Sequence, residues 1–257
     1  MKRYARALLA LLAAAVLLTW IAVAQMPDGR LHVFFLDVVG GQGILLRTPS
    51  GRCVLIDGGT QSSSLMAALG RHLPFWQRTL HAVVATHQGY SALLPLIDAS
   101  QRYRVITALG PAAGSHPTSA YQRWRDVLAD HQTPYVEAQT GTVLDLGDDV
   151  LVHVVGVGDR LVLRITYNQL SLLLPGSDAS ALAGVDETVI ALPYGAASAL
   201  QMPQSVKTTA LILLTGAQRP SPPGVPALAN TQVFSTAALG SLELVSDGHR
   251  SLIHPFH

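Results

Sequence analysis

The amino-acid composition of the chain excludes some classes of protein but does not by itself identify a function. Its one cysteine, Cys53, excludes an internal disulfide framework, and its place inside an apolar run favours a small core residue over a nucleophile. Charged residues make up only 13% of the chain, and 17 Lys and Arg nearly balance 16 Asp and Glu. This balance lacks the basic excess that binds nucleic-acid backbones. Hydrophobic residues, at 49% of 257, are sufficient for one sizeable core.

The N-terminus carries a membrane signal. Three basic residues (Lys2, Arg3 and Arg6) precede an uncharged apolar run of 18 residues, Ala7 to Ala24. The run exceeds the ~7–15 residues of a signal-peptide core and falls within the ~17–25 that span a bilayer, so we expect a single-pass transmembrane helix. Ala22-Val23-Ala24 offers a cleavage site, and a secreted protein released from a signal peptide is the alternative. Under either interpretation the residues after Gln25 are extracytoplasmic.

We therefore divide the chain into residues 1–30, an anchor or signal peptide with a short linker, and one domain over 31–257. The domain opens with three predicted strands, Leu31–Asp37, Ile44–Thr48 and Cys53–Asp57. Pro49-Ser50-Gly51-Arg52 forms a hairpin turn between the last two. The third strand ends on Asp57-Gly58-Gly59, a carboxylate followed by residues that permit close backbone approach.

In the rest of the domain, predicted helices and strands alternate as far as Asp130, and only strands and turns follow. Periodicity and capping predict helices at Ser63–Leu73, Ser91–Ser100 and Thr118–Asp130, and strands at His81–Thr86, Val105–Leu109, Val143–Leu146, Val150–Val155, Leu161–Tyr167, Leu170–Leu174, Thr209–Leu214, Leu242–Val245 and Arg250–Ile253. The hairpin around residues 45–56 is echoed by a second around residues 162–174. Two similar strand-rich halves predict two sheets packed face to face, with helices outside.

The paired hairpins also predict which apolar side chains form the core. We expect eight of them to be buried in the two facing sheets: Ile44, Leu46, Val54, Ile56, Val83, Val84, Leu163 and Leu173.

The opening run, LHVFFLDVVGGQGILLRTPSGRCVLIDGG (residues 31–59), resembles the start of the metallo-β-lactamase-like domain of ComEC-type DNA-uptake (competence) proteins. The hairpin matches closely, whereas Gln42 stands where that family has an Asp. LGSLELVSDG (residues 239–248) resembles the family's closing hairpin, so the resemblance spans nearly the whole domain. It implies a four-layer αββα sandwich with a metal site built from loops at one edge.

The resemblance also shows which metal ligands this chain lacks. The family's HxHxDH motif, which serves two metals, aligns with residues 87–92, where His87 matches the first histidine. Gly89, Ser91 and Ala92 stand at the other ligand positions, and none is a comparable ligand. The family's TGD aligns with Pro175-Gly176-Ser177, which leaves Asp178 one residue late.

Two further loops lack their histidines. The family's PHHGS aligns with residues 193–198 and its NxYGHP with residues 217–220, neither of which contains His. We therefore expect no metal, no cofactor and no catalytic residue, with Asp57, His87 and Asp178 as the edge of a relic site. Asp57 has an equally plain interpretation as a turn residue that caps strand-end amides.

The functional hypothesis is a membrane-tethered pseudoenzyme that binds or assembles with an unknown protein partner. Nucleic acid enters as a partner only by analogy with DNA uptake, and the charge balance does not support it. The alternative is an active hydrolase or phosphodiesterase that uses zinc or manganese at a remodelled site of Asp57, His87 and Asp178. A secreted structural protein without a ligand is a third interpretation.

Overall fold

The structure, a computed structural model, describes Tyr4 and residues 11–13, 15–16, 19–20, 26–40, 42–114, 117–176, 186–193, 207–214 and 231–256. Much of the expected anchor, Ala7 to Ala24, lies outside these residues. Within the described ranges no helix is both long enough and apolar enough to cross a membrane.

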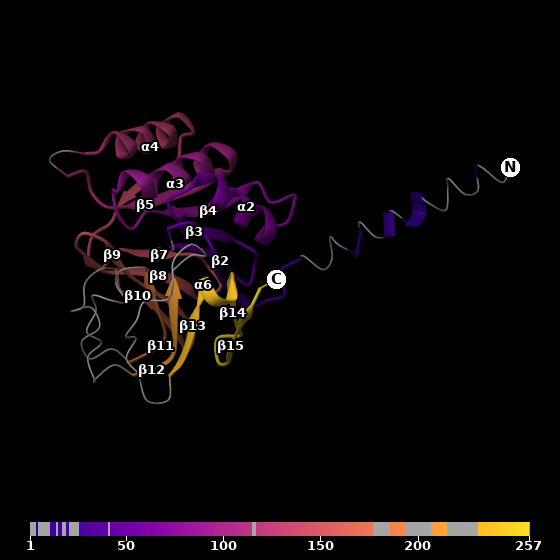
Figure 1. The fold of residues 1–257 in the computed structure, drawn as a ribbon. Coiled ribbons are helices and arrows are strands. Elements are labelled where there is room, and N and C mark those ends of the chain that lie inside the picture. The colour runs from indigo at the N-terminus through magenta and orange to yellow at the C-terminus, as the bar shows by residue number, and fades with distance from the viewer. Residues whose placement is uncertain are drawn as a thin grey trace.

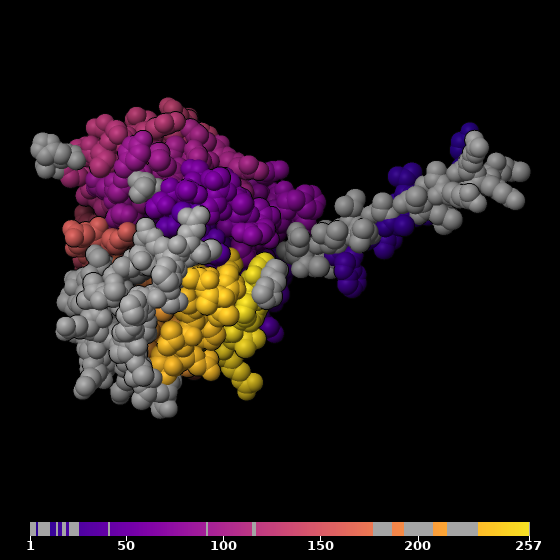
Figure 2. All heavy atoms as spheres, viewed as in Figure 1, coloured from indigo at the N-terminus to yellow at the C-terminus, as the bar shows by residue number. Residues whose placement is uncertain are grey.

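The domain contains a first sheet of eight strands in the order β15-β14-β1-β2-β3-β4-β5-β6. These strands are β1 (Leu31–Phe35), β2 (Gly43–Arg47), β3 (Cys53–Asp57), β4 (Thr79–Val84), β5 (Arg104–Gly110), β6 (Tyr135–Glu137), β14 (Leu242–Ser246) and β15 (Ser251–Pro255). The last two strands of the chain lie next to the first strand of the domain, because β14 pairs antiparallel with β1. Figure 2 shows these C-terminal strands, in yellow, against the N-terminal part of the domain.

The second sheet has seven strands in the order β13-β12-β11-β10-β9-β8-β7. They are β7 (Val143–Asp145), β8 (Val150–Val157), β9 (Leu161–Tyr167), β10 (Leu170–Leu174), β11 (Asp186–Pro193), β12 (Lys207–Leu214) and β13 (Gln232–Ser235). The β9–β10 hairpin repeats the β2–β3 hairpin of the first sheet, and in each case the second strand then pairs parallel with the next. The predicted internal repeat is therefore confirmed.

Alternation along the strands produces two cores. One cluster fills the space between the sheets and includes Ile44, Ile56 and Leu163, while a second lies between the first sheet and its helices. All eight side chains predicted to be buried are buried, at 1% exposure or less. Val83 is buried on the other face of the first sheet, in the helix-facing cluster. Leu173 is likewise absent from the inter-sheet cluster that holds its neighbours Leu172 and Leu174, so it points to the opposite face.

Three helices cover the outer face of the first sheet: α2 (Ser62–His72), α3 (Tyr90–Arg102) and α4 (Ser119–Asp130) (Figure 1). Each connects parallel strands, as expected for βαβ units. Thr118 caps α4 by accepting a hydrogen bond from the Tyr121 backbone amide. On the side of the second sheet the described residues contain only the short α6 (Thr236–Leu239), so a fourth layer is not part of the described fold.

The structure contains four elements that the sequence patterns did not predict. β6 and β13 have three and four residues, too few for alternation to be visible. In β11 the uninterrupted apolar part is only Val189–Leu192, behind two acidic residues. The short α6 corrects the expectation that strands and turns alone follow α4.

Candidate functional site

The candidate site lies where parallel strands of the first sheet end. β3, β4 and β5 run in the same direction, with Ile56 opposite Val84 and Val84 opposite Leu109. Asp57, the last residue of β3, and His87, three residues beyond β4, therefore meet at one edge. This carboxyl edge is where ligand sites of open α/β sheets are usually built.

Asp57 is used to join two strand ends. Its side chain is buried, and its backbone is in the left-handed region with φ of 52°. One carboxylate oxygen, Oδ1, accepts the Thr86 backbone amide at 2.8 Å, and Oδ2 accepts the Thr86 hydroxyl at 2.5 Å. Both oxygens are therefore already engaged by strong charge-assisted hydrogen bonds. The geometry is that of a turn residue capping a strand-end amide.

His87 adjoins the same hydroxyl. Its Nδ1 lies 3.2 Å from the Thr86 oxygen. Burial lowers the pKa of His87 below its usual value; the Asp57 carboxylate opposes this shift and the Arg160 guanidinium adds to it. The ring is therefore neutral at pH 7, the form that can bind a metal.

Gly89, at the family's second histidine position, lies directly against the His87 ring. A Cβ added to Gly89 would stand 3.0 Å from His87 Cδ2 and 3.1 Å from Nε2. A side chain there would therefore require the imidazole to shift. The required shift is a few tenths of an ångström, so the contact is tight but involves only the His87 side chain.

The loop after β4 is also fixed from outside. The Gln88 side-chain amide donates to the Ala112 carbonyl at 2.5 Å, and the Thr118 hydroxyl donates to the Gln88 carbonyl at 3.2 Å. Gly89 then forms the N-cap of α3. These hydrogen bonds attach the loop after β4 and the start of α3 to the segment before α4. They therefore help to hold His87 in place.

A positive charge reaches this edge from the second sheet. Arg160, in the turn between β8 and β9, donates from Nη1 to Gln42 Oε1 at 2.6 Å across 118 residues of sequence. The next residue, Leu161, donates its amide to the Thr86 carbonyl at 2.8 Å. These two contacts bring Arg160 to the same edge as His87, and its charge helps to lower the pKa of that imidazole. A fixed guanidinium there opposes the approach of a divalent cation.

The donors in the described residues do not fit the metal centre of the resembled family. No three side chains of His, Cys, Asp and Glu in the described parts of the chain converge as a metal ligand group. Asp57 and His87 are two donors, one of them already engaged, whereas a catalytic zinc ordinarily takes three protein ligands. Asp178 lies outside the described residues, as do residues 194–198 and 217–220.

Sequence reasoning missed Thr86, Arg160 and Gln42 as participants. Thr86 could have been recognised as a hydroxyl placed immediately before His87, beside an acidic strand end. Cys53 is buried in β3, where burial raises its thiol pKa to about 11, as suits a core residue and not a nucleophile.

Comparison with solved structures identifies the architecture. No family model matches the chain, and no curated protein matches it by sequence. The metallo-β-lactamase fold protein YhfI from Bacillus subtilis superposes with a TM-score of 0.53 at 13% identity, over 73% of this chain and 86% of that one. A variant of the β-hydroxylase CmlA superposes with a TM-score of 0.51 at 14% identity, over 90% of this chain and 54% of the hydroxylase. The two-sheet α/β domain of this chain thus has the metallo-β-lactamase fold.

Proposed function

We propose that the protein is a membrane-tethered, extracytoplasmic metallo-β-lactamase-fold domain that has lost most of its metal ligands and acts by binding or assembly. The observation that carries the proposal is the state of the carboxyl edge. Both carboxylate oxygens of Asp57 accept hydrogen bonds from Thr86, and the positive charge of Arg160 acts on His87.

Hydrolysis in this fold depends on a metal-bound hydroxide. A metal ion lowers the pKa of its water only if enough protein donors hold it in a fixed, open geometry. His87 can offer one imidazole nitrogen, and Asp57 would have to give up hydrogen bonds to a buried hydroxyl and amide. Glycine at 89 and alanine at 92 offer no side-chain donor. The chemistry of the edge therefore favours a structural use of both residues.

The tether rests on the sequence. Positive charges before an apolar run of 18 residues orient the N-terminus toward the cytoplasm, which leaves the domain outside. The resemblance of residues 31–59 to ComEC-type proteins supports a partner in a DNA-uptake or envelope complex. We assign that partner to the protein class and not to DNA, because a net charge of only +1 gives the chain little attraction for phosphates.

A phosphodiesterase assay with added Mn²⁺ tests the non-catalytic role. With bis(4-nitrophenyl) phosphate as the probe substrate, the protein should show no turnover above buffer containing the metal alone. The His87→Ala and Asp178→Ala variants should be indistinguishable from it. An active-site interpretation requires turnover that both substitutions abolish.

The competing function is a hydrolase with a remodelled site of Asp57, His87 and Asp178. The observation that favours it is the spacing after β10, where Asp178 falls only one residue from the position of the family's bridging Asp. A small loop shift could bring it to the edge. Zinc or manganese would then be the cofactor.

A further inference from the structure

The edge opposite the candidate site carries its own chemistry. β1, β3, β4 and β5 run in one direction, because β2 pairs antiparallel with both β1 and β3 and the later pairs are parallel. Their first residues therefore lie together at what we call the amino edge, about one strand length from Asp57.

The linker to the N-terminal segment is attached at the amino edge. Pro27 packs on Gly51 of the β2–β3 turn so closely that a Cβ on this glycine would lie 2.6 Å from the proline Cγ. Asp28 Oδ1 lies 2.8 Å from His32 Nε2, and the buried His32 also contacts Glu243 at 2.6 Å. The chain thus leaves the domain at Pro27, three residues after the apolar run ends at Ala24.

Exposed aromatic residues lie at the same edge. The loop between α2 and β4 presents Phe75, 66% exposed, and Trp76, 40% exposed, with their rings in edge contact at 4.7 Å. β4 lies three strands from β1, which corresponds to about 14 Å. Large apolar side chains exposed side by side mark an interaction surface.

Three exposed arginines lie at the same edge as the aromatic pair. Arg78, Arg102 and Arg104 are exposed, and Arg104 donates its backbone amide to the Arg78 carbonyl at 2.9 Å. Residues 73–80 and 99–106 contain no acidic residue. The acidic neighbours are Asp98 and Asp130, near the ends of α3 and α4. The exposed surface formed by these arginines with Phe75 and Trp76, which we call the strip, is therefore both basic and aromatic.

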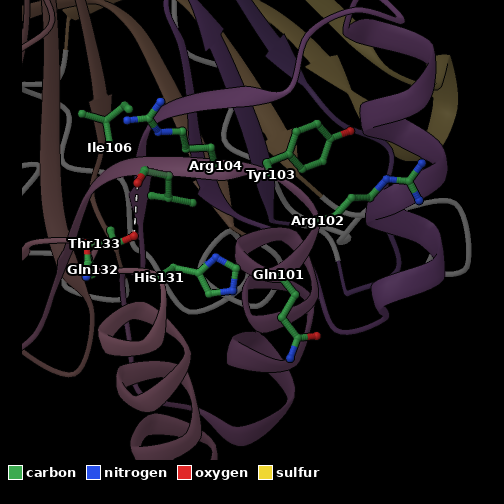
Figure 3. Close-up of a pocket in the computed structure, with 9 residues that line it drawn as sticks. Gln101, Arg102, Tyr103, Arg104, Ile106, His131, Gln132 and Thr133 are labelled. Carbon is green, nitrogen blue, oxygen red and sulfur yellow. Dashed lines mark hydrogen bonds between the residues drawn. The ribbon is translucent and has the colours of Figure 1, made fainter.

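A hollow of about 340 Å³ opens beside the strip, lined by residues 101–106 and 131–133 (Figure 3). Arg102 and Arg104 extend to opposite sides of this hollow, with His131 between them. The Thr133 hydroxyl donates to the Val105 carbonyl at 3.1 Å and shapes its floor. Separated guanidinium groups around a shallow polar hollow suit several anionic headgroups rather than one enclosed ligand.

We propose that this basic-aromatic edge (Phe75, Trp76, Arg78, Arg102 and Arg104) rests on the anionic lipid surface of the membrane to which the linker leads. The inference rests on the proposed tether for its geometry. Tryptophan prefers the bilayer interface, and guanidinium groups are attracted to anionic lipid headgroups in the leaflet that the domain faces. The Asp57–His87 edge then faces away from the membrane, toward partners in the extracytoplasmic space.

The turns on the other side of the amino edge carry charges of both signs. Asp148 accepts hydrogen bonds from the Thr48 hydroxyl and the Ser50 amide, both at 2.9 Å, which holds the β7–β8 turn against the β2–β3 turn. Asp145 and Asp149 belong to the same turn region. Arg52 packs on the same turn and donates to the Leu146 carbonyl at 2.7 Å, so this side has mixed charge and attracts anionic lipid less than the basic-aromatic edge does.

Tryptophan quenching in vesicles tests the proposal. The full-length Trp20→Phe protein is reconstituted in phosphatidylethanolamine–phosphatidylglycerol vesicles that contain lipids brominated near the headgroup end of the acyl chain. Two tryptophans remain; Trp124 is fully buried and supplies an unquenched baseline. We expect Trp76 to be quenched, and quenching to fall when phosphatidylcholine replaces phosphatidylglycerol.

Matched variants distinguish lipid binding by the arginines from nearness to the bilayer that the tether alone would produce. Arg78→Gln with Arg104→Gln should strongly reduce quenching, whereas Arg123→Gln, an exposed arginine in the first half of α4, should not. A second measurement is co-sedimentation of the domain, released from its N-terminal segment, with the same vesicles. The partition coefficient of the double variant should be roughly 25-fold lower than that of the unaltered domain, about fivefold for each arginine.

The outcomes distinguish the edge from the tether. If Trp20 is quenched in the unaltered protein while Trp76 is not, the tether stands and lipid docking is refuted. If neither is quenched, both the tether and lipid docking fail. Vesicle binding that is lost altogether, or that does not depend on the arginines and on phosphatidylglycerol, would also refute lipid docking, and in the latter case would favour a protein occupant.

Discussion

Asp57 and Thr86 hold the ends of two parallel strands together through two hydrogen bonds, from the Thr86 amide at 2.8 Å and the Thr86 hydroxyl at 2.5 Å. Both residues are at most 2% exposed. A carboxylate that could have faced a ligand is instead turned inward, to satisfy the amide where β4 ends. Asp57 therefore acts as a clamp between the ends of β3 and β4.

The clamp predicts unequal effects of two similar substitutions. Thr86→Val removes the hydroxyl and leaves Asp57 Oδ2 buried without that donor, which should lower the free energy of unfolding by ~1–3 kcal/mol. Thr86→Ser keeps the hydroxyl and serves as the matched control. Urea denaturation followed by circular dichroism gives both values. Equal losses in the two variants would mean that the hydroxyl does not matter.

His72 predicts an acid-sensitive stability. Its ring is buried against Phe34 and Phe256, and its Nδ1 finds no hydrogen-bond partner among the described residues. Burial lowers its pKa to about 4; nearby Arg71 adds to this and Glu243 opposes it. The unfolded state then binds the proton more readily than the folded state. The contribution to stability is complete above about pH 6.5 and is lost as the pH falls toward 4, by about 3 kcal/mol.

The measurement for His72 is the free energy of unfolding between pH 7 and 4. His72→Phe keeps an aromatic ring and removes the titration, so its curve should be flatter in this window. Some slope should remain, because burial also lowers the pKa values of His81 and His87. A curve for His72→Phe that parallels the unaltered protein would contradict this assignment.

The two faces of the sheets can be compared through Ile56 and Leu173. Ile56 is fully buried between the sheets, and Leu173 is 1% exposed on the other face of the second sheet. Truncation to Ala should cost ~2–5 kcal/mol at each fully packed site. Thermal or urea unfolding measures both. Losses below about half a kcal/mol at both positions would show that the strand assignment is wrong.

The topology predicts where a protease can act. Because Lys2, Arg3 and Arg6 precede the apolar run, the domain from Leu31 onward should be digested by protease added to intact spheroplasts. A cytoplasmic protein in the same cells serves as the control for lysis. Protection of the domain until the cells are broken would place it on the other side of the membrane.

Much of the fold was predictable because strand-length apolar runs alternate with turns. The β2–β3 and β9–β10 hairpins were visible as a repeat, and their register in the structure agrees. The face of Val83 was not predictable, because β4 is covered on both sides and its apolar run shows no alternation. The same reason hides the face of Leu173 in β10, where three leucines occur in a row.

The site was only half predictable. Asp57 and His87 follow apolar strands directly, so their meeting at one edge could be inferred from parallel pairing. Arg160 could not, since a turn of the second sheet delivers it to Gln42 only after the two sheets pack. Side-chain pairs of this kind depend on tertiary arrangement and leave no spacing pattern in the chain.

The central claim is that the carboxyl edge has become structural, and metal content tests it most directly. We expect elemental analysis of protein purified without chelator to find well under one zinc or manganese per chain. Chelator should leave the unfolding transition unchanged, because no metal-binding energy is linked to folding. His87→Ala should also leave stability nearly unchanged. Stoichiometric metal that is lost in His87→Ala, together with turnover lost in the same variant, would contradict the account and establish the hydrolase.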